Sequence, residues 1–295
     1  MASLATSDIA VPIEVANDIW AKTMQTSVLA RLSGQQPQKF GESKIMTLAG
    51  DPKAELVGEG ADKSPTPVEF GVKTVTPRKV QVTIRMNDEV KWADEDYQLD
   101  IWNTCVERGS NALGRALDLI GIHRINPLTG TAVTSITDYI AATTNSYTLA
   151  AGHYAEAVEA AAGLIVADGF VPNGLAMDPT FSFGLATQRD NNNVPLNPGL
   201  GFGQGTAGYM GMTAAVSNTV SAPEAATATN LHAIIGDFGA FRWGVQRDIG
   251  ATIIEYGDPD GLGDLQRKNQ IALRMEIVYG IAVLDPNAFA KVITA

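Results

Sequence analysis

The feature that most constrains the fold is a strict two-residue alternation over residues 271–283. Apolar side chains occupy every odd position of this range: Ile271, Leu273, Met275, Ile277, Tyr279, Ile281 and Val283. Because successive side chains of a strand point to opposite faces of a sheet, this period predicts one long strand. A second alternation, over 80–86, predicts a half-buried strand in the N-terminal half. We expect the C-terminal strand to return and pair with it.

A long helical segment follows the first of these strands, at about residues 94–122. It opens with the acidic run Asp94-Glu95-Asp96, which complements the positive end of a helix dipole, and it stops before Asn126-Pro127. A helix of this length spans ~42 Å at 1.5 Å per residue. Such a helix suits a spine that crosses a flat molecule.

The N-terminal region, residues 1–42, contains a predicted amphipathic helix that starts at Pro12 and ends at Gly34. Its apolar stripe includes Trp20, and no helix adjacent in sequence covers it. It must dock on a distant part of the chain or on a neighbouring subunit. We expect trimming through Leu32 to lower assembly more than solubility.

Residues 43–79 have the pattern of a hairpin. Short strands are expected at 45–48, 54–57 and 68–75, with turn residues at Gly50-Asp51-Pro52, Gly58-Glu59-Gly60 and Ser64-Pro65-Thr66-Pro67. The part between about 50 and 67 is charged and has little to build a core. Because an isolated two-stranded hairpin is only marginally stable in water, we expect this one to lie on another surface.

The middle region is predicted to be a mixed α/β insertion between the N-terminal half, which carries the strand at 80–86, and the C-terminal strand at 271–283. Helices are expected at about 153–167 and 179–188, around a glycine- and asparagine-rich loop at 190–208 and several strands. The expected strands are 175–177, 212–217, 232–237 and 249–256.

Two short motifs contain residue types that are found in ligand-binding sites. Residues 203–208 match G-x-G-x-x-G, but the flanking sequence lacks the preceding strand and following helix that a phosphate site needs, so we interpret them as a loop. Residues 258–264 hold three aspartates whose spacing is not that of an EF-hand. A turn between strands is the favoured interpretation there, with metal binding as the alternative.

No constellation of catalytic residues stands out. The three histidines, His123, His153 and His232, are isolated from one another, and a G-x-S-x-G signature is absent. Cys105 lies on an apolar helix face, where burial is expected rather than reactivity. We predict no catalytic residue, no cofactor and no metal, and therefore a protein that is not an enzyme.

Composition limits the partners and the compartment. The net charge of −11 disfavours non-specific binding of DNA, since such binders need Lys and Arg to displace counterions. A single cysteine excludes an intrachain disulfide and fits a reducing assembly site. We find neither a secretory signal at the start nor an apolar run of ~18 residues, so we expect no membrane association.

Several stretches resemble tailed-bacteriophage major capsid proteins of the HK97-like fold, and together they cover nearly the whole chain. The hairpin contains Glu55-Leu-Val-Gly-Glu59-Gly, and the C-terminal half contains four further stretches. These are Trp243-Gly-Val-Gln-Arg247-Asp248, Glu255-Tyr-Gly257-Asp258-Pro259, Asn269-Gln270-Ile-Ala-Leu-Arg274-Met-Glu276 and Tyr279-Gly280-Ile-Ala-Val-Leu-Asp285-Pro286-Asn-Ala-Phe289.

The resemblance implies an α+β chain with named parts. These are an N-terminal arm (1–42), an extended β-hairpin or E-loop (43–79), a peripheral domain (80–150 and 255–295) with the spine helix, and an inserted α/β axial domain (151–254). In such shells the arm and the hairpin lie over neighbouring subunits. The candidate inter-subunit contacts are Trp20, Lys53, Glu55, Glu59, Asp62, Lys63 and Phe70.

The implied function is a structural subunit that self-assembles into hexamers and pentamers of an icosahedral phage capsid enclosing double-stranded DNA. Implied partners are copies of itself, a separate scaffolding protein, a portal and a decoration protein, with assembly in the bacterial cytoplasm and residence in the virion. An encapsulin-type nanocompartment shell is the alternative of the same fold. A soluble α/β hydrolase or dehydrogenase is the alternative from another class, and it rests only on the glycine loop.

Overall fold

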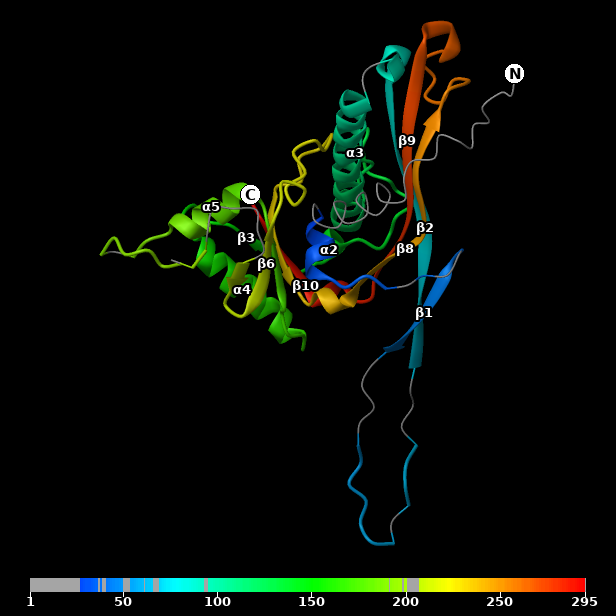
Figure 1. The fold of residues 1–295 in the computed structure, drawn as a ribbon. Coiled ribbons are helices and arrows are strands. Elements are labelled where there is room, and N and C mark those ends of the chain that lie inside the picture. The colour runs from blue at the N-terminus through cyan, green and yellow to red at the C-terminus, as the bar shows by residue number, and fades with distance from the viewer. Residues whose placement is uncertain are drawn as a thin grey trace.

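Two β-sheets and the long helix α3 (Glu95–His123) form the framework of the computed structural model (Figure 1). The structure describes residues 27–36, 38, 41–49, 54–60, 62–65, 69–92, 95–190, 192–197, 199–200 and 207–294. One sheet carries α3 along its length, and the other carries two shorter helices. The hairpin between β1 and β2 extends away from both sheets.

The first sheet has four antiparallel strands in the order β1-β2-β9-β8. Their bounds are β1 (Ser43–Ala49), β2 (Glu69–Asn87), β8 (Phe241–Ile254) and β9 (Gln270–Val283). β2 and β9 pair over twelve positions, from Thr76 opposite Ile281 to Asn87 opposite Gln270. The predicted pairing of the two alternating strands is therefore confirmed.

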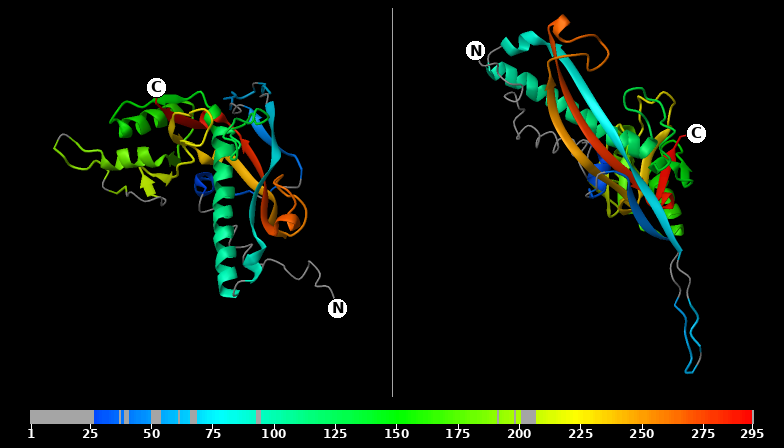
Figure 2. Two further views of the ribbon diagram at one scale, coloured as in Figure 1. Left: turned by 90° about the horizontal axis from the view of Figure 1, so that it is seen from above. Right: turned by 90° about the vertical axis from the view of Figure 1, so that its right-hand side faces the viewer.

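Helix α3 lies on one face of this sheet (Figure 2). Gly109 faces β9, and a Cβ there would force the terminal methyl group of Met275 to move. Tyr279 of β9 is buried and donates a hydrogen bond from its hydroxyl to the Leu113 carbonyl oxygen, at 3.1 Å. The helix predicted at about 94–122 is thus present with almost the same bounds.

The second sheet has six strands in the order β3-β10-β7-β4-β6-β5. Their bounds are β3 (Ser146–Thr148), β4 (Gly174–Met177), β5 (Ala207–Tyr209), β6 (Met212–Val216), β7 (Leu231–Gly236) and β10 (Phe289–Ile293). Helices α4 (Tyr154–Ala167) and α5 (Pro179–Thr187) cover one face through a core that includes Ile165, Phe181 and Ile235. Asp178 caps α5 by accepting a hydrogen bond from the Thr180 amide.

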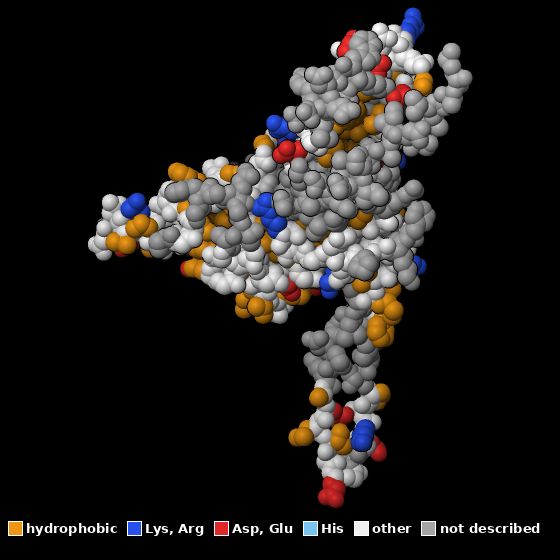
Figure 3. All heavy atoms as spheres, viewed as in Figure 1, with side chains coloured by type: hydrophobic (Ala, Val, Ile, Leu, Met, Phe, Trp, Pro, Cys, Tyr) orange, Lys and Arg blue, Asp and Glu red, His pale blue; other side chains and the backbone are white. Residues whose placement is uncertain are grey.

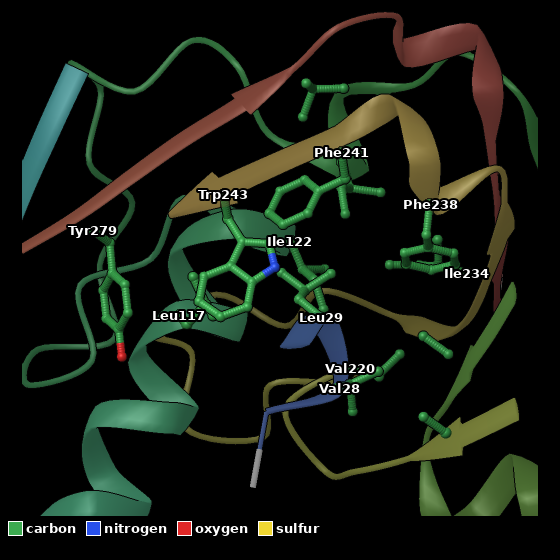
Figure 4. Packing of buried hydrophobic residues seen from close by; sticks show 14 of the residues in the cluster. Val28, Leu29, Leu117, Ile122, Val220, Ile234, Phe238, Phe241, Trp243 and Tyr279 are labelled. Carbon is green, nitrogen blue, oxygen red and sulfur yellow. The ribbon is translucent and has the colours of Figure 1, made fainter. Parts of the chain in front are cut away.

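The short helix α2 (Val28–Leu32) fills the junction between the two sheets. Val28 and Leu29 are fully buried, and they pack with Trp243 of β8 and with Ile122 near the end of α3 (Figure 4). The buried cluster also receives residues of β4, β6 and β7, so α2 connects the cores of both sheets.

The prediction of one continuous helix from Pro12 to Gly34 is wrong at Ser27. Ser27 has an extended backbone and caps α2 by accepting a hydrogen bond from the Ala30 amide, so a new helix begins there. The part of the prediction before Ser27, including Trp20, lies outside the described residues.

Three strand predictions also differ from the structure. Residues 54–57 are irregular, since no described residue pairs with them in a ladder. β2 continues through Pro77. The pairing of β1 with β2 ends at Ser43 opposite Val75, so that among the described strands only β9 borders Pro77, and an open side of this kind tolerates proline. β8 starts at Phe241 rather than at 249, and two bulges between Val245 and Gly250 obscure its alternation.

Sheet membership differs from the expected ranges at three strands. β8 falls within 151–254 but pairs with β9 in the first sheet, whereas β10 and β3 lie outside 151–254 and belong to the second. The chain therefore crosses between the sheets more often than a simple insertion would require.

Short 3-10 turns connect several elements. They are η2 (Asp88–Trp92), η3 (Ile140–Ala142), η4 (Phe238–Ala240), η5 (Gln266–Lys268) and η6 (Pro286–Ala288). Within the described part of the chain, no helix combines the length and the apolar character that crossing a bilayer demands.

Candidate assembly surfaces

An exposed apolar face lies at the foot of the hairpin, where β1 and β2 form a two-stranded ribbon. Met46 stands directly opposite Val72, and Leu48 opposite Phe70. Directly opposed residues of antiparallel strands project to the same face. The exposed fractions are 69% for Met46, 56% for Val72 and 65% for Phe70, and hydrophobic side chains are visible at this foot in Figure 3. We call Met46, Phe70 and Val72 the ribbon face.

The outer end of the hairpin, residues 54–60 and 62–65, holds together by a side-chain contact across the loop. The Ser64 amide and hydroxyl both donate hydrogen bonds to the Glu55 carboxylate, and they lower its pKa. Leu56 is fully exposed there, and Glu59 and Asp62 are exposed as well. This end offers acidic and apolar groups to solvent without a core of its own.

The predicted contact residues fall in three places. Glu55, Glu59, Asp62 and Lys63 gather at the outer end of the hairpin, and Phe70 lies on the ribbon face. Trp20 and Lys53 lie outside the described residues. Sequence reasoning did not single out Met46 and Val72, because the face that they share with Phe70 follows from the pairing register of β1 and β2.

A buried carboxylate, Asp118 of α3, fixes the start of the described N-terminal segment. Its Oδ1 accepts hydrogen bonds from the Ser27 hydroxyl at 2.5 Å and the Leu29 amide at 3.1 Å. Its Oδ2 accepts from the Val28 amide at 2.9 Å and from the Thr219 hydroxyl at 2.7 Å. One side chain thus joins α2, α3 and the loop that follows β6.

Asp118 is completely buried. Burial raises its pKa, while its four donors oppose that rise. Two of these donors are backbone N–H groups at the start of α2, which have no partner within the helix, so the carboxylate also acts as a cap. The arrangement shows that residues 27–33 belong to the core of their own subunit.

The aspartate-rich loop at 258–264 is held by Arg85 of β2. The Arg85 guanidinium binds both Asp260 oxygens, lies 3.4 Å from Asp258 Oδ1 and donates to the Gly263 carbonyl oxygen at 3.0 Å. The hydrogen bond from Arg85 is the main reason that the pKa of Asp260 is lowered. This favours the turn interpretation, since these carboxylates face an internal cation.

The three histidines serve separate local contacts. His123 Nε2 lies 2.8 Å from the Val220 carbonyl oxygen and 3.2 Å from that of Thr219. His153 Nδ1 lies 2.8 Å from Glu156, and His232 contacts Thr294. Among the residues that the structure describes, no three His, Cys, Asp or Glu side chains are grouped to hold a metal. Burial raises the pKa of Cys105, which disfavours a reactive thiolate.

The glycine loop leads into a strand. Residues 201–206 lie outside the described residues, and β5 begins at Ala207. A phosphate-binding G-x-G-x-x-G motif opens a helix whose N-terminus faces the phosphate, which this arrangement does not provide.

Comparison with protein families places the chain beside phage proteins. The model of the phage capsid family matches residues 8–293. A curated relative, the probable major capsid protein of Mycobacterium phage D29, is 24% identical over 288 residues, which cover 94% of this chain and 87% of the relative.

Solved structures agree with this placement. A chain from Mycobacterium phage Ogopogo is 52% identical with a TM-score of 0.83, and the match covers 91% of this chain and 92% of that one. A chain from Gordonia phage Cozz is 35% identical with a TM-score of 0.78, over 91% and 86% of the two chains. The fold as a whole therefore recurs in relatives that share a third to a half of their residues with this chain.

Proposed function

Because this chain belongs to the phage capsid family and has its HK97-like fold, we propose that its hairpin joins copies of it into hexamers and pentamers. The chain is a structural subunit of the virion capsid. The nanocompartment alternative has no support among these relatives. We propose below which surfaces join the subunits and what the shell encloses.

The exposed ribbon face carries the proposal. Three apolar side chains, each more than half exposed, lie on one side of a ribbon that projects from the body. Removing such a surface from water stabilises an assembly by roughly 25 cal/mol per Å² of apolar area. Copies that repeat one heterologous contact around a closed ring form oligomers of this kind. The ribbon face and the outer end of the hairpin are therefore the inter-subunit contacts.

We also propose what the shell contains and which other proteins complete the particle. The shell encloses double-stranded DNA without gripping it, because a chain with a net charge of −11 does not attract phosphates. A separate scaffolding protein, a portal and a decoration protein complete the particle, which assembles in the host cytoplasm. The subunit has no catalytic role. The names arm, E-loop, peripheral domain and axial domain remain our proposed division of the chain.

Deleting residues 51–66 tests the role of the hairpin. This segment adds no described residue to the buried core, so the shortened chain should remain folded and soluble but form no particles. Circular dichroism checks the fold, and electron microscopy with sedimentation checks assembly. Normal particles from the shortened chain would overturn the proposal.

A substitution pair tests the ribbon face itself. Changing Met46 and Val72 to serine should reduce particle yield at least tenfold while leaving thermal unfolding of the subunit unchanged. Leu128→Ser is the matched control, because Leu128 is 92% exposed and lies outside the hairpin. Equal yields from the double variant and the control would remove the ribbon face from the contact.

A further inference from the structure

A cavity of about 460 Å³ lies beside the C-terminal end of α3. Its walls come from the turn after α3, from η3, from the loop before β7 and from β10. Two cationic residues, Arg124 and Lys291, line it together with the hydroxyl-bearing side chains of Thr131, Thr227 and Thr229. The described residues around it include no Asp or Glu. In a chain of net charge −11, this is a local concentration of positive charge.

Neither cation is neutralised by a carboxylate within the described part of the subunit. The Arg124 guanidinium lies 4.9 Å from the ring centroid of Tyr139, a cation–π contact that orients it without removing its charge. Lys291 Nζ donates to the Ala141 carbonyl oxygen at 3.1 Å. His123 also lines the cavity, but burial lowers its pKa and it adds no charge at neutral pH.

Arg124 occupies a position where the backbone favours glycine. It follows the last residue of α3 with φ of 56°, and the amides of Arg124 and Ile125 donate to the carbonyl oxygens of Ile120 and Leu119. Such a helix end usually carries Gly or Asn, because a side chain is strained there. Strain of this kind concentrates at functional sites, which indicates a use for the Arg124 side chain.

The cavity wall is preformed. Gly130 accepts a hydrogen bond at its carbonyl oxygen from the Ala226 amide, at 2.9 Å. A Cβ at Gly130 would collide with the backbone of Glu224, so the two loops approach as closely as their main chains allow. A ligand therefore meets a wall whose backbone is already held in place.

The outer end of the hairpin carries a net negative charge, because Glu55, Glu59 and Asp62 outnumber Lys63 there. Glu59 and Asp62 are exposed, and no described residue pairs with either carboxylate. Glu55, by contrast, is occupied by Ser64. Figure 1 shows that the hairpin extends away from the end of α3, so its acidic end does not approach the cavity of its own subunit.

We propose that the cavity beside α3 receives the acidic end of the hairpin, with Glu59 and Asp62, from a second copy of the chain. The inference rests on the proposed role of the hairpin in assembly and names the surface on which it lies. Arg124 and Lys291 bind the incoming carboxylates, and the Thr227 hydroxyl donates to an oxygen that remains, whereas the Thr229 hydroxyl already donates to the Ser221 carbonyl oxygen.

Charge exchange tests this pairing. Arg124→Glu with Lys291→Glu, and separately Glu59→Lys with Asp62→Lys, should each lower particle yield at least tenfold, measured by sedimentation and electron microscopy. Combining all four changes in one chain should restore the yield to within about threefold of the unmodified protein. Arg267→Glu, an exposed cation outside the cavity, is the control and should leave the yield unchanged.

Arg124→Gly separates assembly from folding. Glycine suits the backbone there, so the unfolding temperature of the subunit should not fall, whereas particle yield should drop several-fold because one cation is lost. A yield unaffected by Arg124→Gly, or a four-residue exchange that fails to restore particles, would overturn the pairing. If the 51–66 deletion still abolished particles in that case, the hairpin would keep its role with another receiving surface. Normal particles from the deletion would refute both.

Discussion

At the scale of single residues, Asp118 shows how an acidic side chain can organise a core. It receives four hydrogen bonds from two separate segments and has no contact with solvent. A helical aspartate is ordinarily interpreted as part of a solvated face, and spacing alone does not distinguish it from the exposed acids of the same chain. Its role depends on Ser27 and Thr219, each about a hundred positions away, which sequence patterns cannot bring together.

Replacing Asp118 with asparagine should destabilise the subunit by about 2–4 kcal/mol, because an NH₂ group would then face two donors and leave them unsatisfied. Urea unfolding of the unassembled subunit measures the effect. Asp138→Asn is the matched control: Asp138 lies 3.3 Å from Lys73 and is one-third exposed, so its loss should cost at most about 1 kcal/mol. Equal effects at the two sites would contradict the role given to Asp118.

His123 predicts a dependence of stability on pH. Burial lowers its pKa, and its two carbonyl partners only partly oppose the shift. The unfolded chain takes up a proton near the ordinary value of about 6.5, while the folded chain resists it. The contribution of His123 to stability is therefore full above that pH and is lost as pH falls through the lowered pKa.

His123→Gln should accordingly flatten the decline in stability between pH 7 and pH 5.5, since glutamine can still donate to the Val220 carbonyl but does not titrate. Urea midpoints at the two pH values provide the measurement. His153→Gln, at an exposed position, should leave the decline as it is. An unchanged decline in the His123 variant would mean that other groups cause it.

At the scale of elements, α2 changes the expectation for the last part of the N-terminal region. Sequence patterns left open whether the apolar stripe of the predicted helix docks on its own chain or on a neighbour, and Trp20 of that stripe lies outside the described residues. The structure places Val28 and Leu29 inside the subunit, against Trp243 (Figure 4). Gly244 and Gly280, which are paired in register, leave room for Gln36 and Gln38 against the sheet, because a Cβ at Gly244 would collide with Gln36 and one at Gly280 with Gln38.

Truncation should therefore be costly once it passes Ser27. A chain lacking residues 1–26 keeps Ser27, Val28 and Leu29 and serves as the reference. A chain lacking residues 1–32 should lose about 5 kcal/mol or more, since it forfeits two buried apolar side chains and three of the four donors to Asp118. Soluble expression and thermal unfolding of both chains test this. A soluble, stable 33–295 chain would contradict the packing described, and would favour the earlier expectation that trimming through Leu32 affects assembly first.

At the scale of the whole molecule, the strongest periodic signals located the framework. The alternation at 271–283, its partner at 80–86 and the helix at about 94–122 are present and in contact, because each buries a continuous apolar face against the others. The order of the elements, which resembles that of phage capsid proteins, identified the fold. Predicting the two strands and the helix required only local side-chain patterns and the pairing of two strands that are distant in sequence.

What the sequence could not predict depended on tertiary context. The bulges of β8 break its alternation, and the short strands β3 and β10 join the second sheet by crossing from the other half of the chain. Of the candidate contact residues, the charged ones were proposed from the composition of the hairpin and stay a prediction. Met46 and Val72 were missed, because an exposed apolar pair is recognisable only when the register and the open face are known.

This chain is a capsid subunit, and we propose that copies of itself cover the exposed surfaces of its hairpin. Electron microscopy of the purified protein over a range of concentrations tests it most directly. We expect capsomer rings or closed hollow particles that become more abundant as concentration rises. A compact monomer that stays monomeric at high concentration would contradict the account.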